Sequence, residues 1–116
     1  MSIKMKRAYE AASSDDGYRV LVDRLWPRGV RKESLRVEEW LKDLAPSTEL
    51  RKWFNHDPER FQEFKKRYQE ELKNQKEELK RLKEIAAGRT LTLVYSAKEP
   101  QLSQAVVLQG VLERMK

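Results

Sequence analysis

Three short segments of the chain have the hydrophobic pattern of β-strands. Residues 3–8 alternate apolar and charged side chains, which is typical of a strand with one solvent-facing side. Residues 18–23 and 90–95 are apolar at neighbouring positions, as the run from Val20 to Val22 illustrates. A strand that is apolar on both sides must be covered on both sides. We therefore expect these two segments in the middle of a sheet, with helices against both faces.

Four segments have the signals of helices. Ser47 can cap free backbone amides, and Asp57 followed by Pro58 is a strong start signal for a second helix. Asn74 to Glu77 resembles a capping box for a third helix, and Gly88 is a suitable end for it. The predicted helices span about 47–55, 58–72, 74–88 and 98–112, each with apolar residues on one stripe.

The order of these elements indicates the fold class. A strand, a long helical section, a strand and a helix are typical of an α/β protein with a small, mostly parallel sheet flanked by helices. Residues 35–40 fit either a short helix or an edge strand, and the pattern does not separate the two. We expect one compact domain over residues 1–116, because this length supports a single core.

Polar and aromatic side chains follow each predicted strand at its carboxyl end, where parallel α/β sheets bind their ligands. Arg7 and Tyr9 follow the first strand, Asp23, Arg24, Trp26 and Arg28 the second, and Ser96 and Lys98 the third. Arginine binds phosphate or carboxylate through two parallel hydrogen bonds, and an aromatic face can stack on a ring. The set predicts a small anionic ligand, such as a nucleotide or another phosphate-bearing compound.

Asp23 and His56 are the candidates for acid–base chemistry. The alternative for Asp23 is a structural ion pair with Arg24, with Trp26 in the core. His56 is the only histidine, and the sequence has no cysteine and no Gly-x-Ser-x-Gly motif that would give it a nucleophile. The alternative for His56, which the sequence favours, is a structural role at a turn between helices. No metal site is predicted, because one histidine without clustered acids is a poor ligand set. Whether any reaction is catalysed stays open.

Composition adds a second class of function. The net charge is +6 and the pI is near 9.6, which admits nucleic acid as a partner. Acids and bases nevertheless alternate through most of the chain, so the alternative to a ligand pocket is a nucleic-acid- or protein-binding module with a basic surface. Without cysteine, signal sequence or membrane span, a cytoplasmic location is expected. No glycine-rich phosphate loop follows a strand, so no cofactor is predicted.

Several motifs resemble a known family in the order in which they occur. They are Val22–Gly29, Trp40–Ser47, Leu50–Phe54, His56–Arg60 and the spaced Phe64, Tyr68 and Glu71-Leu72. On these motifs the chain resembles the bacterial YeaO-like branch of domain-of-unknown-function family 488, over nearly its whole length. The resemblance implies a compact α/β domain and supplies no established activity.

One segment departs from that family pattern. After Val94 to Lys98, family members usually carry His-Asn before Ala-Val-Val-Leu, whereas Leu102-Ser103-Gln104 stands there in this chain. If those polar residues help to form the family's site, this protein has changed or lost their contribution.

Overall fold

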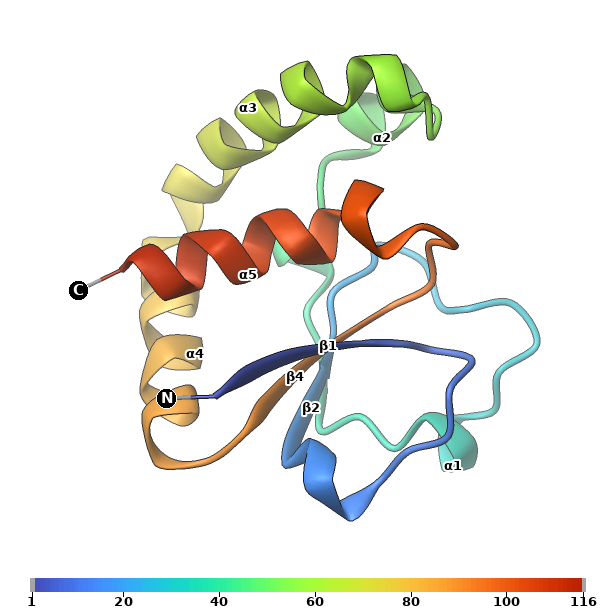
Figure 1. Cartoon of the computed structure of the whole chain (residues 1–116), viewed down its shortest axis with the longest axis vertical. Coiled ribbons are helices and arrows are strands. Elements are labelled where there is room, and N and C mark those ends of the chain that lie inside the picture. Colours follow the sequence, from blue (N-terminus) through green and yellow to red (C-terminus); the bar gives the residue numbers. More distant parts are fainter. Residues whose placement is uncertain (1, 116) are drawn as a thin grey trace.

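The computed structural model contains one four-stranded sheet in which all neighbouring strands are parallel (Figure 1). It describes residues 2–115, so Met1 and Lys116 of the predicted domain lie outside the described residues. The strands are β1 (Ile3–Arg7), β2 (Tyr18–Leu21), β3 (Glu39–Trp40) and β4 (Leu91–Tyr95), in the spatial order β1-β4-β2-β3. The predicted parallel α/β class is confirmed, with β2 and β4 in the middle of the sheet.

Most of the helical residues come after β3. The helices are α1 (Lys32–Leu35), α2 (Thr48–Phe54), α3 (Phe61–Leu72), α4 (Lys76–Gly88) and α5 (Gln104–Arg114). Ser47 caps α2 as predicted, because its side chain accepts a hydrogen bond from the Leu50 amide. None of the helices in residues 2–115 combines the length and apolar character needed to cross a membrane.

Three predicted helix starts differ from the structure. Asp57 caps a 3₁₀ turn (Pro58–Arg60), and α3 begins after it at Phe61. The expected capping box at Asn74 is absent, because a 3₁₀ turn (Lys73–Gln75) joins α3 to α4 and no side chain caps α4. The last helix begins at Gln104 rather than near Lys98, since Ser103 supplies the capping oxygen to the Val106 amide. A 3₁₀ turn (Pro100–Leu102) fills the preceding residues.

The two faces of the sheet are covered by different kinds of structure. On one face, α2 to α5 bury the main core, which includes Val20, Val22, Leu91 and Leu93 of the central strands. On the other face, Leu21 and Val94 pack against the segment 24–37 and its short helix α1. Figure 1 shows α3, α4 and α5 gathered on one side of the strands and α1 on the other. The expected cover on both faces is confirmed, but the second face is covered mainly by an irregular segment with one short helix.

This second layer also resolves the ambiguity at residues 35–40. Leu35 ends α1 and is fully buried, whereas Trp40 lies in β3, paired with Leu21 of β2. The Trp40 indole packs edge-on against Trp26, with ring centroids 5.3 Å apart. Because tryptophan and leucine side chains are large, a loop that carries them covers this narrow face without a long helix.

Truncation of the main core tests the importance of the layer of long helices. Leu82 of α4 is fully buried, so Leu82→Ala should lower the free energy of unfolding by about 2–5 kcal/mol. Lys80, exposed on the same helix, is the matched control: Lys80→Gln should change it by less than about 0.5 kcal/mol. Urea denaturation measures both, and equal effects would contradict the assignment of Leu82 to the core.

Candidate functional site

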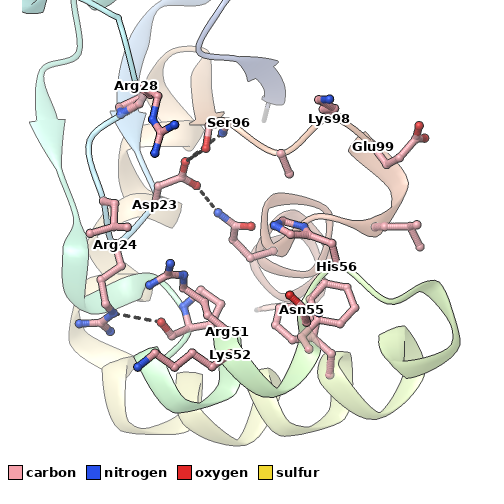
Figure 2. Close-up of a pocket in the computed structure, with 18 of the residues that line it drawn as sticks. Asp23, Arg24, Arg28, Arg51, Lys52, Asn55, His56, Ser96, Lys98 and Glu99 are labelled. Atoms are coloured by element: carbon pink, nitrogen blue, oxygen red, sulfur yellow. Dashed lines mark hydrogen bonds between the residues drawn. The ribbon is translucent and has the colours of Figure 1, made fainter.

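A cleft of about 900 Å³ opens beyond the carboxyl ends of β2 and β4 (Figure 2). Its walls come from the loop after β2, the loop after β4, the end of α2 and the start of α5. The predicted site residues that line it are Asp23, Arg24, Trp26, Arg28, His56, Ser96 and Lys98. The rule that ligands bind beyond the carboxyl ends of parallel strands thus correctly predicted that these residues, far apart in the sequence, lie close together. Their roles in binding stay predictions.

Arg7 is the predicted site residue that does not line the cleft. Its guanidinium donates hydrogen bonds to the carbonyl oxygens of Ala97, at 2.9 Å, and of Ser96, at 3.2 Å. The same group lies 5.1 Å from the ring centroid of Tyr9, which does line the cleft. Arg7 therefore holds the loop after β4 and supports Tyr9 from outside the cleft.

Asp23 is held by donors from two other segments. Its Oδ2 accepts hydrogen bonds from the Ser96 amide at 2.9 Å and from the Ser96 hydroxyl at 2.5 Å. Its Oδ1 accepts a hydrogen bond from the side-chain amide of Gln104. Burial raises the pKa of Asp23, and these hydrogen bonds, together with the nearby Arg51 guanidinium, act in the opposite direction. We call these three side chains, Asp23, Ser96 and Gln104, the Asp23 clamp.

The Asp23 clamp changes the interpretation of Asp23. The carboxylate accepts three hydrogen bonds from within the protein and is only 7% exposed, so most of its acceptor positions are already used by protein donors. Its geometry fits a residue that positions the two loops around it. Gln104, at the segment where the chain departs from the family pattern, supplies one of the three bonds.

The predicted Asp23–Arg24 ion pair does not form. The Arg24 guanidinium donates instead to the carbonyl oxygens of Pro46, at 3.0 Å, and Ala45, at 3.2 Å. Trp26 lines the cleft but also belongs to the second core layer, and its indole N–H donates to the Val30 carbonyl at 2.7 Å. The alternative that Trp26 packs in the core is therefore correct for much of its ring.

Positive charge dominates the cleft. Five cationic side chains line it: Arg24, Arg28, Arg51, Lys52 and Lys98. Within residues 2–115 none of them forms an ion pair, and the carboxylates of the cleft are Asp23 and Glu99. Figure 2 shows Arg28 and Arg51 near the space in front of Asp23, with Lys98 and Glu99 at the outer rim. Low-dielectric walls strengthen the electric field of such a group of like charges.

His56 is held at the cleft by an unusual turn at the end of α2. Asn55 and His56 both have left-handed backbone conformations, with φ of 47° and 55°. This conformation is uncommon outside glycine, although asparagine and histidine adopt it more readily than most residues. The turn brings His56 to face the same space as Arg51 (Figure 2).

Sequence reasoning missed Arg51, Lys52, Asn55 and Gln104. Asn55 immediately precedes His56, and Arg51 lies one helical turn before Asn55, so the polar side of this helix could have indicated both residues. Gln104 lies in the segment noted as departing from the family pattern, but its contact with Asp23 could not be predicted because it depends on how α5 packs. Among residues 2–115, no group of three or more His, Cys, Asp or Glu side chains could hold a metal ion.

The fold and the cleft define a class: a small parallel α/β domain with a cationic cleft beyond its central strands. The chain belongs to the DUF488 family, because residues 2–116 match the family described as "Inactive DUF488-N3 subclade". It is 48% identical to "Uncharacterized protein YeaO" of Escherichia coli (strain K12) over 115 residues, which are 99% of this chain and 100% of that protein. The predicted YeaO-like resemblance is confirmed.

Mycobacterial relatives share part of the chain. Over 62 residues it is 58% identical to "Uncharacterized protein Mb3100c" of Mycobacterium bovis (strain ATCC BAA-935 / AF2122/97), covering 53% of this chain and 52% of that protein. The same values hold for "Uncharacterized protein Rv3073c" of Mycobacterium tuberculosis (strain ATCC 25618 / H37Rv). No solved structure is significantly similar to the chain.

Replacing Asp23 by asparagine separates its charge from its hydrogen bonds. An asparagine oxygen can still accept from Ser96, and its amide can donate to Gln104 once that side chain is flipped. Since the pKa of Asp23 is raised above its ordinary 3.8, ionisation of Asp23 costs the folded state stability as the pH rises through that region. Asp23→Asn should therefore become more stable relative to wild type between about pH 4 and about pH 7.

Urea denaturation of both proteins at the two pH values measures this difference. Carboxyl groups with lowered pKa, such as those of Asp16 and Glu39, are common to both proteins and cancel in the comparison. A difference in stability that stays constant with pH, or falls, would contradict the raised pKa of Asp23.

Proposed function

We propose that the cleft binds a small anionic ligand that carries phosphate, and that the protein acts as a binding domain. The observation that carries this proposal is the set of five cationic side chains that line one concave surface without a carboxylate partner among residues 2–115. Like charges gathered in this way repel one another, so an anion that joins them lowers the energy of the site.

Arg28 and Arg51 are the side chains best suited to hold the phosphate. Neither guanidinium donates a hydrogen bond to another described residue, so their donors are available to a ligand. Paired N–H groups match phosphate oxygens in a planar, two-point geometry. Arg24 is less available, because two of its donors already bind the carbonyl oxygens before α2.

Binding is favoured over catalysis by the state of Asp23. The carboxylate already accepts three hydrogen bonds, and the family description contains the word "Inactive". His56 is exposed at the cleft and is available to bind an anion through its ring N–H. A cytoplasmic location, expected from the absence of cysteine, stays a prediction.

A nucleic-acid- or protein-binding surface is less well supported. On the outer helices, cations pair with acids on the same helix, as in Arg67–Glu63 and Arg81–Glu78. Such alternating charge gives a weak field for a long polyanion. The cleft gathers five cations without ion pairs on one concave surface, in a space suited to a small ligand.

Titration calorimetry with inorganic phosphate at low ionic strength tests the proposal. Wild type should bind phosphate, and Arg28→Lys should weaken binding several-fold although the charge is kept, because the planar fork is lost. Arg51→Gln should weaken it by about 10- to 100-fold, since a charged hydrogen bond contributes about 1.5–3 kcal/mol.

Arg31→Gln is the matched control for charge. Arg31 is exposed on the same loop as Arg28 but does not line the cleft, so its loss should leave phosphate affinity within about two-fold. Equal losses for Arg28→Lys and Arg31→Gln would show a diffuse charge effect. Absence of binding to wild type would overturn the proposed function.

A further inference from the structure

The exposed large hydrophobic side chains of residues 2–115 are both at the cleft. Tyr9 is 51% exposed and Leu25 is 63% exposed, and both line it. Scattered exposed hydrophobic residues are ordinary on protein surfaces, but in this chain they coincide with the cationic site. Their position gives the cleft an apolar part beside its charged part.

The Tyr9 ring is fixed in place although it is half-exposed. Its hydroxyl group donates a hydrogen bond to the Arg28 carbonyl at 3.2 Å. The Arg7 guanidinium lies 5.1 Å from the ring centroid and is itself held by the carbonyl oxygens of Ser96 and Ala97. A tyrosine anchored at its tip and supported by a cation keeps its orientation while much of its surface stays accessible. Such a ring is a ready platform for stacking.

Trp26 is less suited to that task. Its indole is packed edge-on against Trp40, and its N–H is used by the Val30 carbonyl. The aromatic contact expected from the sequence at Trp26 is thus better provided by Tyr9.

The cleft has room for a ligand larger than a phosphate group. Pockets of about 300–1,000 Å³ enclose ligands of drug-like size. This cleft, at about 900 Å³, is far larger than one phosphate group needs. Because the Tyr9 hydroxyl binds the backbone of Arg28, the ring and one of the phosphate-binding candidates are neighbours. A ligand with a phosphate and a ring a few bonds apart can contact both.

We infer that the ligand is of the nucleotide class: a phosphate ester joined to a planar base that stacks on Tyr9. This inference rests on the proposed function, since it assigns the ring-binding part of the same cleft. Arg28 and Arg51 bind the phosphate, Tyr9 binds the base, and Leu25 adds apolar contact at the rim. Arg7 is a positioning residue that holds Tyr9 from outside the cleft.

Calorimetry with adenosine 5′-monophosphate and ribose 5-phosphate, at matched ionic strength, tests the inference. The two probes share the phosphate and sugar and differ in the base. Wild type should bind the nucleotide at least ten-fold more tightly. Base–aromatic stacking is strong enough that Tyr9→Ala should weaken nucleotide binding by about 5- to 100-fold and change ribose 5-phosphate binding by less than about two-fold.

Three further variants separate stacking from structure. Tyr9→Phe keeps the ring and should retain most of the nucleotide affinity, whereas Tyr9→Leu keeps apolar bulk without an aromatic face and should behave like Tyr9→Ala. Tyr18→Phe is the matched control, because it removes a tyrosine hydroxyl bound to Glu39 outside the cleft. It should leave both affinities unchanged.

The possible failures are distinguishable. Equal affinity of wild type for the two probes, or equal weakening of both by Tyr9→Ala, would overturn the base contact and leave the phosphate site in place. No binding of either probe or of inorganic phosphate would overturn the proposed function as well. A single-stranded oligonucleotide without a terminal phosphate that binds more tightly than the mononucleotide would overturn the assignment to a free nucleotide.

Discussion

The buried carboxylate of Asp23 is the constraint on which the arrangement of the cleft depends. A carboxyl group removed from water must be hydrogen-bonded, and here the donors come from Ser96 after β4 and Gln104 at the start of α5. The backbone carbonyl of Asp23 also accepts from the Trp40 indole at 2.8 Å, which ties in β3. Satisfying one residue therefore fixes the ends of three strands and a helix relative to one another.

The segment 24–37 links the stability of the fold to the shape of the site. Its apolar side chains, including Trp26 and Leu35, cover the second face of the sheet, while Arg24 and Arg28 reach the cleft. Pro27, whose ring limits its own backbone, lies between the packed tryptophan and Arg28. The backbone position of Arg28 is thus tied to the packed segment, so a change in this core layer also alters the cleft.

The sequence predicted what depends on local pattern and on general topology. The central strands were predicted because Val20–Val22 and Leu91–Tyr95 are apolar on both sides, and the end of the parallel strands then located Asp23, Arg28 and Ser96. Apolar residues on both sides of a strand indicate that both faces of the sheet are covered, but they do not indicate which structure covers each face. The segment 24–37 over the second face was therefore not predicted. The contact between Gln104 and Asp23 could not be predicted, because it depends on how α5 packs.

The edges of the sheet have a consequence for association between chains. An unpaired strand edge can add a strand from another molecule, which leads to aggregation. One edge here is β3, which is only two residues long, and the other is β1, which carries Lys4 and Lys6. Both lysines bind the carboxylate of Asp16, at 3.7 and 3.2 Å, so their charge stays beside the strand. A very short edge strand and an edge strand that carries lysines are both poor partners for a strand of a second chain. The fold thereby protects its small parallel sheet from aggregation through its edges.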